Sequence, residues 1–158
     1  MSQFIPPLFV SQGSPRLFLA VGRAGNLLSA PGQALPRPRV ILVASAHWDT
    51  NLPAVSTTEH PPAIPDCYGF PARPDTRPAW AGGCVDGIAA RLAPADADGL
   101  LDCRRAAPHG ARAHPTEDHQ VPLSFARGAG GGGGHGLPAG ATRGSLAMDA
   151  FVFEGRIG

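Results

Sequence analysis

Lysine does not occur in this 158-residue sequence, and its thirteen basic residues are all arginine. Twelve acidic residues nearly balance them, so the formal net charge is only +1, and the arginines are scattered along the chain. Nucleic acids and anionic membranes attract proteins through clustered positive charge. The sequence therefore gives no electrostatic reason to expect a nucleic acid or a membrane as partner.

Long apolar runs are also missing, since none approaches the roughly 20 residues of a membrane-spanning helix. The first ten residues contain no basic segment and include Pro6 and Pro7, which argues against a secretory signal peptide. Cysteine is scarce, and Cys67, Cys84 and Cys103 form no CxxC pair, so neither a zinc ribbon nor a disulfide framework is indicated. We expect a soluble cytoplasmic protein, with oligomerisation left open.

Glycine and proline, in contrast, are abundant: 21 glycines and 18 prolines make up about a quarter of the chain. Such a composition is close to that of loop-rich or disordered proteins. The apolar content of 43% is nevertheless ordinary, and a fully disordered chain would have less. We expect a single, loop-rich domain with a thin core.

The strongest strand signal is the run of β-branched and apolar residues at 40–45. It is apolar on both faces, as in a central parallel strand that helices cover on each side. Shorter strand candidates lie at residues 8–11, 54–58 and 146–153. With the helices expected between them, this order of elements predicts the α/β class.

Helices are expected at residues 17–28, 85–92, 97–106 and 122–126, the last of them ending at Gly128. The proline-rich segments 31–39 and 59–79 are expected to be a connector and a long loop. Residues 128–136 are almost all glycine and predict a flexible, exposed linker. His135 in this linker is then expected to be solvated.

Side chains that could carry chemistry gather at three places: residues 12–15, residues 45–48 and residues 114–119. The first two follow predicted strands, and ligands of open α/β sheets bind at the carboxyl ends of strands. The third holds two histidines and two carboxylates, which suit Zn(II) or non-haem Fe(II). From spacing alone, a lone histidine at a strand end such as His47 is more often a hydrogen-bonded structural residue. Residues 114–119 could equally be a solvated turn, because a spacing of five does not place both histidines on one face of a helix.

Five segments resemble, in order, segments of the class III (LigB-type) extradiol ring-cleavage dioxygenases, in the branch of the 4,5-DOPA dioxygenases. The most specific are Ser-Ala-His-Trp at 45–48 and His-Pro-Thr-Glu-Asp-His-Gln-Val-Pro-Leu at 114–123. The others are the opening strand and turn at 8–15, the loop Pro-Pro-Ala-Ile-Pro-Asp-Cys-Tyr-Gly-Phe-Pro at 61–71, and the closing strand at 144–151. The resemblance covers residues 5–71 and 80–154.

The resemblance implies a LigB-like α/β sheet flanked by helices, and an O₂-dependent opening of a catechol ring at a non-haem Fe(II) or Zn(II) ion. By position, His47 and His119 would be metal ligands, and His114 would be a catalytic residue on the substrate side. The residues expected to line or support the site are Ser14, Trp48, Asp66 and Tyr68.

The sequence also departs from the family at two points. Gln12 stands where the family has its first histidine ligand, and an amide oxygen is a poorer ligand for iron or zinc. The middle section of the family, with a further ligand motif, has no counterpart, so residues 72–79 join the early loop to the late helices. We therefore expect one incomplete dioxygenase-like domain over residues 1–158, with weak metal binding and little turnover.

Two other functions compete with this reading. One is a non-catalytic remnant or binding module that keeps half of the fold. The other is a metal-dependent hydrolase, which ranks low because the sequence has neither a nucleophile elbow nor an HExxH motif.

Overall fold

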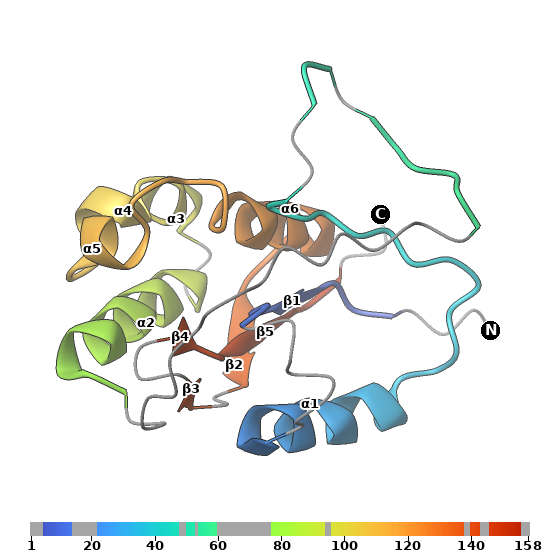
Figure 1. The fold of residues 1–158 in the computed structure, drawn as a ribbon, viewed down its shortest axis with the longest axis horizontal. Coiled ribbons are helices and arrows are strands. Elements are labelled where there is room, and N and C mark those ends of the chain that lie inside the picture. The colour runs from blue at the N-terminus through green and yellow to red at the C-terminus, as the bar shows by residue number, and fades with distance from the viewer. Residues whose placement is uncertain are drawn as a thin grey trace, which may run out of the picture.

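The computed structural model describes residues 5–13, 22–47, 50–52, 54–59, 77–93, 96–137, 140–142 and 146–155. Within them the chain is a mixed α/β protein, as the sequence predicted (Figure 1). The strands are β1 (Leu8–Val10), β2 (Gly134–Leu137), β3 (Ala141–Thr142), β4 (Leu146–Ala147) and β5 (Ala150–Phe153). The helices are α1 (Gly22–Ala34), α2 (Ala79–Leu92), α3 (Ala97–Leu101), α4 (Cys103–Ala106), α5 (Gly110–Ala113) and α6 (Val121–Gly130).

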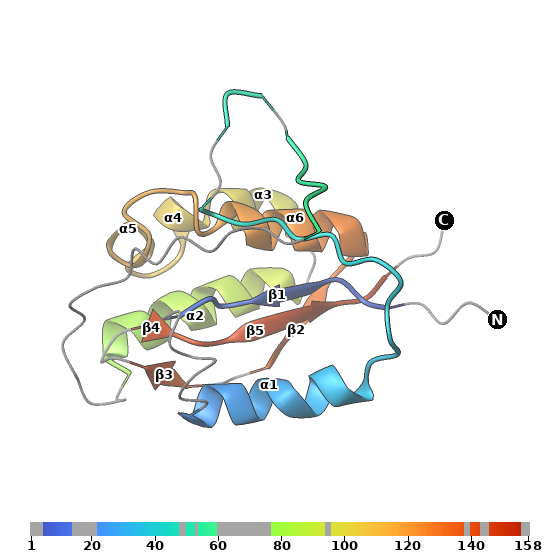
Figure 2. The ribbon, with the colours of Figure 1, turned by 45° about the vertical axis from the view of Figure 1, so that its right-hand side comes forward.

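The main sheet of the described part has three strands in the order β1-β5-β2, and β5 is antiparallel to both neighbours. In the register, Phe9 and Gly136 both stand opposite Phe151. The rings of Phe9 and Phe151 lie 6.1 Å apart, a cross-strand aromatic contact that stabilises the pairing. In both ribbon views α1 and α6 lie on opposite sides of this sheet (Figures 1 and 2).

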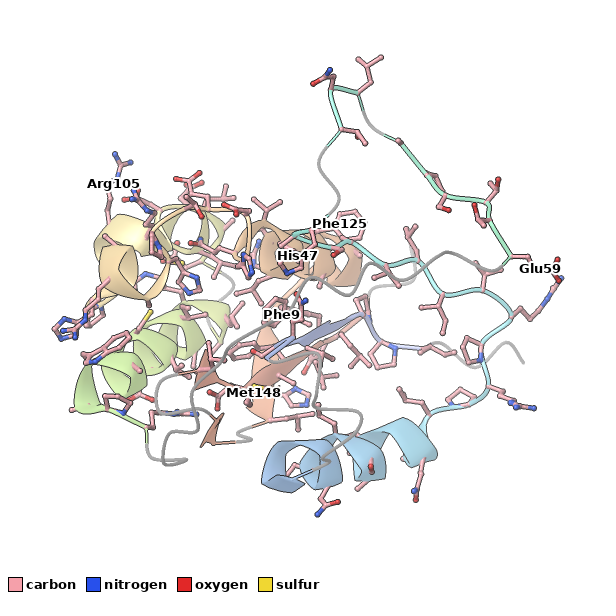
Figure 3. All side chains as sticks on the ribbon, viewed as in Figure 1. Phe9, His47, Glu59, Arg105, Phe125 and Met148 are labelled. Atoms are coloured by element: carbon pink, nitrogen blue, oxygen red, sulfur yellow. The ribbon has the colours of Figure 1, made fainter. Side chains whose placement is uncertain are left out.

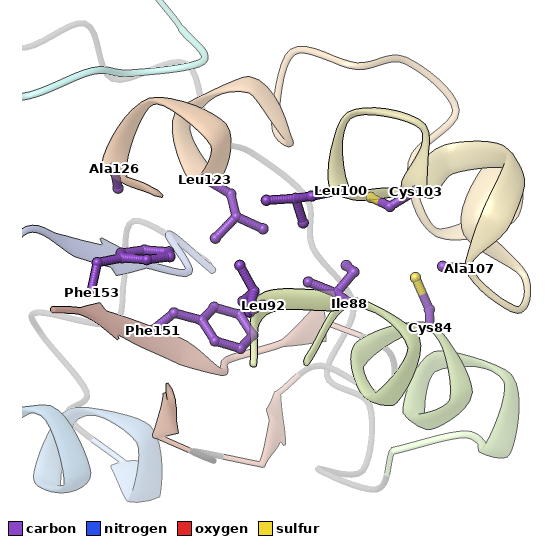
Figure 4. Close-up of a cluster of buried hydrophobic side chains, with 10 residues drawn as sticks. All are labelled: Cys84, Ile88, Leu92, Leu100, Cys103, Ala107, Leu123, Ala126, Phe151 and Phe153. Carbon is purple, nitrogen blue, oxygen red and sulfur yellow. The ribbon is translucent and has the colours of Figure 1, made fainter. Parts of the chain in front are cut away.

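The hydrophobic core lies between the sheet and the helices α2, α3, α4 and α6 (Figure 4). On α2 the buried residues Cys84, Ile88 and Leu92 follow one another at a spacing of four, which places them on one face of the helix. They meet Phe151 and Phe153 of β5, and Phe153 is completely buried. The described parts of the chain contain no helix long and apolar enough to cross a membrane.

Two cysteines belong to this core. Cys84 and Cys103 are both buried, and both are free thiols. Burial is the main cause that raises the pKa of the Cys103 thiol to about 11, because a low dielectric disfavours the thiolate. At neutral pH these side chains therefore behave as small hydrophobic groups.

The predicted strands at 40–45 and 54–58 are wrong. Both segments are irregular and exposed, and Val40 and Ile41 expose 83% and 72% of their surface. A strand that is apolar on both faces needs a paired neighbour and cover on both sides, and β5 already pairs at both of its edges. The strands of the main sheet are also antiparallel rather than parallel. Residues 54–59 belong to a loop that stands away from the helices and the sheet (Figure 1).

The glycine-rich stretch is the second difference, because residues 128–136 contain the end of α6 and the start of β2 instead of an irregular linker. A Cβ atom on Gly130 would lie 2.5 Å from the Cβ of Phe153, and one on Gly134 would lie 2.7 Å from its ring. Glycine is therefore what lets this stretch pack on a core phenylalanine. Between the two elements, Gly131 ends the helix in the left-handed conformation, with φ 66°.

The remaining boundaries shift by a few residues. Helix α1 overlaps the helix predicted at 17–28 but runs on through Pro31 to Ala34, into the expected connector. The helix predicted at 97–106 is divided into α3 and α4, and the strand predicted at 146–153 into β4 and β5. The strand at the start is confirmed as β1, and most of the loop predicted at 59–79 lies outside the described residues.

Candidate functional site

The loop between α5 and α6 carries both histidines of the third sequence segment. His114 ends α5, and its backbone N–H donates to the carbonyl of Gly110 at 2.8 Å. The other end of the loop is Gln120, which precedes α6, is buried, and donates from Nε2 to the carbonyl of Leu100 at 2.9 Å. The two imidazoles are thus held on a short loop whose ends are both fixed.

His47 meets His119 although 71 residues separate them in the chain. Their rings lie 4.9 Å apart between centroids and cross at 87°, edge to face. His47 is exposed, and its backbone N–H donates to the hydroxyl of Ser45 at 3.2 Å. Figure 3 shows His47 beside the helix that carries Phe125, above the strands of the main sheet in that view. The structure therefore brings together two of the three predicted metal ligands.

A carboxylate lies beside this pair. The Oδ2 of Asp118 is 3.8 Å from the Nδ1 of His119. The side chain of Thr116 donates a hydrogen bond that lowers the pKa of Asp118, and the neighbouring His119 and His47 lower it further. Asp118 is thus held ionised, and its negative charge favours a cation at the two imidazoles.

His114 lies deeper than the other two histidines. Its pKa is lowered mainly by burial and further by the nearby His119, so His114 is neutral at neutral pH and can accept a proton. It opens on a cavity of about 90 Å³. The walls of this cavity are mostly apolar and come from β1, α2, α6 and β5, and its polar residues are Ser11, His114, His119, Gln120 and Asp149.

Asp149 in this cavity was not identified from the sequence. It is 5% exposed, its Oδ2 accepts from Nη2 of Arg77 at 2.5 Å, and its carbonyl accepts from the hydroxyl of Ser11 at 2.6 Å. The same guanidinium also donates to the carbonyl of Gly140 at 2.8 Å. The available signal was a single acidic residue inside the apolar stretch that precedes the last strand, since a buried carboxylate needs a partner.

The other predicted site residues are less informative. Gln12 follows β1 and is exposed. Ser14, Trp48, Asp66 and Tyr68 lie outside the described residues.

The fit to a metal ion can be judged on the described residues alone. They contain no group of three or more histidine, cysteine or acidic side chains placed to hold a metal ion. Zinc and non-haem iron sites usually have three or four protein ligands. His47 and His119 by themselves would therefore be an incomplete set of ligands, and Gln12 is the one further ligand that the sequence suggests.

Comparison with known proteins adds the following. The chain is 42% identical over 67 residues to 4,5-DOPA dioxygenase extradiol of Escherichia coli (strain K12), a match that covers 42% of this chain and 25% of that protein. It is 49% identical over 35 residues to the dioxygenase tasH of Hapsidospora irregularis, which covers 22% of this chain and 11% of that protein. No family model and no solved structure matches.

The aligned regions cover only a small part of each relative. The chain spans about a quarter of the length of the first relative. It is therefore related to extradiol dioxygenases over a fragment, and the activity of the whole proteins does not transfer with that fragment.

Proposed function

We propose that this chain carries an impaired extradiol dioxygenase site, in which His47 and His119 bind a non-haem metal ion. The observation that supports the proposal is the 4.9 Å approach of these two imidazoles, together with the partial identity to two dioxygenases. The reaction would be the O₂-dependent opening of a catechol ring next to its two hydroxyl groups. When bound, Fe(II) or Zn(II) would supply a Lewis-acidic centre for the two catechol oxygens.

The residues around the metal would handle protons and exclude water. His114 is neutral and half-buried at the cavity, so it can accept a proton from a catechol hydroxyl. The apolar walls would limit water on the cavity side, while His47 and His119 are exposed on the other. His114 stands at the start of the loop between α5 and α6, and the apolar walls come mainly from β1, α2, α6 and β5.

Two features argue that turnover is low. The described residues offer two strong ligands instead of three, so a metal ion would exchange readily with buffer. The cavity of about 90 Å³ is also smaller than the about 150 Å³ cavity known to hold benzene. A catechol ring would enter it only in part unless the walls move.

The second candidate is a non-catalytic remnant or binding module of the same fold. The short span of the chain relative to the matched dioxygenases favours it. Metal content separates the two functions, because a dioxygenase site must bind a metal ion and a remnant need not. Under either function the partners would be small molecules, a catechol and O₂ in the first case, and a cytoplasmic location stays a prediction.

The test begins with metal affinity and ends with activity. Zinc and iron binding should fall in His47→Ala and His119→Ala and stay unchanged in His135→Ala, which removes an exposed histidine of β2. Equal binding by all three variants would support the remnant. Activity is measured as the yellow ring-opened product of DOPA or protocatechuate in air, with added Fe(II) under reducing conditions. We expect little or no product, and steady turnover that His119→Ala abolishes would show that the site is complete.

A further inference from the structure

The loop of residues 114–120 is held at both ends by one pair of short helices. At its end, Gln120 Nε2 donates to the carbonyl of Leu100 in α3. At its start, Arg104 of α4 donates to the carbonyls of His114 and Pro115. Hydrogen bonds to α3 and α4 thus fix both ends of the loop that carries the two histidines.

The contact made by Arg104 is a fork. Its Nε lies 3.0 Å from the His114 carbonyl oxygen and its Nη2 lies 2.9 Å from that of Pro115. A guanidinium is planar and presents its donors in a fixed geometry, so the fork sets the direction of two successive peptide groups. The Cα of His114 directly precedes the first of these peptide groups, and its side chain reaches the cavity.

The base of the fork is itself firmly packed. A Cβ atom on Gly110 would lie 2.5 Å from the carbonyl oxygen of Cys103 and 2.6 Å from that of Arg104. Helix α5 therefore approaches the backbone of α4 closely, and Cys103 is buried in the core. Because the backbone of α4 is closely packed, the Arg104 side chain can fix the position of the two carbonyl groups that it contacts.

We propose that Arg104 is a positioning residue for the candidate site: its fork sets His114 at the cavity and carries His119 to its contact with His47. The inference rests on the proposed function only for what the imidazoles bind. The position of the rings is a property of the polypeptide and can be measured without a metal ion.

The neighbouring Arg105 is a matched control. It pairs with Asp102 three residues earlier, at 2.6 Å, and its side chain is 82% exposed. Within the part of the chain that the structure describes, the Arg105 side chain bonds to Asp102 of its own segment and not to the loop. Arg104→Lys and Arg105→Lys therefore make the same chemical change, and only the first removes the fork.

The experiment compares the two variants with the unaltered protein by NMR and by zinc titration. In the metal-free protein, Arg104→Lys should lose the nuclear Overhauser contact between the rings of His47 and His119, while Arg105→Lys keeps it. Zinc affinity should fall roughly tenfold in Arg104→Lys alone, a cost typical of groups that orient metal ligands. Retention of the ring contact in Arg104→Lys, or its loss in both variants, would overturn the proposal.

A second measurement covers the case in which Arg104→Lys does not fold. In the unaltered protein, the Nε–H of Arg104 should exchange slowly with solvent and show a coupling through its hydrogen bond to the carbonyl carbon of His114. Absence of both signals would overturn the proposal. The ring contact could depend on Arg104 although neither the variants nor the unaltered protein binds zinc or iron. In that case the positioning role stands and the proposed function fails.

Discussion

Replacing Gly130 by alanine tests whether the glycine-rich stretch is packed or free. The new Cβ would lie 2.5 Å from the Cβ of Phe153 and 3.5 Å from its Cγ. Phe153 is 0% exposed, so it cannot move away into solvent. Overpacking of this kind costs about 1–3 kcal/mol. The better helix propensity of alanine offsets less than about 1 kcal/mol of that at the last residue of α6.

Gly128 in the same helix is the control. It is exposed, and a Cβ there would meet nothing within 4 Å. Gly128→Ala should therefore stabilise the protein by about 0.5–1 kcal/mol, while Gly130→Ala destabilises it by about 1–2 kcal/mol. With a urea m-value of about 2 kcal/mol per molar, the unfolding midpoints of the two variants should differ by about 1 M.

The assay is urea unfolding followed by far-ultraviolet circular dichroism. Gly128→Ala should shift the midpoint up and Gly130→Ala should shift it down, with the same slope. Midpoints that move together would mean that Gly130 does not touch Phe153, and that the stretch is the linker which its composition suggested.

Two further predictions concern the cavity. Because burial lowers the pKa of His114 below its ordinary 6.5, the unfolded chain binds this proton more readily, and the free energy of unfolding should fall as the pH drops below about 6.5. Urea midpoints between pH 7.5 and 5 should show this slope, and His114→Gln should reduce it. Asp149→Asn removes a buried partner of Arg77 and should cost about 2 kcal/mol, or about 4–8 °C in melting temperature. Asp102→Asn at an exposed pair should change stability by less than about 1 kcal/mol, and equal losses would contradict the role of burial.

Local signals predicted α2 and α6 well, because each of these helices carries its own pattern, but they did not predict α5. The spacing of Cys84, Ile88 and Leu92 places one apolar face on α2, and Pro122 suits the first turn of α6. The α/β class followed from the order of the elements. In contrast, the strand at residues 40–45 needed partners that no local pattern can supply, and in the structure its side chains are exposed.

The site was predictable where a motif carried it and not where packing did. His114 and His119 were chosen from one short segment, and His47 from another, and the structure places the rings of His47 and His119 4.9 Å apart. Asp149 contacts Arg77, 72 residues away in the chain, and Arg104 contacts His114 and Pro115, 10 and 11 residues away. Nothing in the neighbouring sequence marks such contacts, since hydrogen bonds to carbonyl groups do not depend on the identity of the accepting residue.

Gln12→His tests whether residue 12 limits metal binding. Gln12 stands where the related family has its first histidine ligand, and it directly follows Ser11, which lines the same cavity as His119. An imidazole is a stronger ligand than an amide oxygen for zinc or iron. A third imidazole within reach should raise zinc affinity at least about tenfold, which corresponds to about 1.4 kcal/mol.

Competition against a coloured chelator measures this affinity. Gln33→His is the control, because it adds a histidine at an exposed position of α1 without adding a ligand to the site. A rise in Gln12→His alone, lost again when His119→Ala is added, would place the third ligand at residue 12. Equal affinities of Gln12→His and Gln33→His would contradict the prediction. The limiting defect would then lie in the middle section of the family, for which the sequence shows no counterpart, because a better ligand at the end of β1 would not supply the ligand motif of that section.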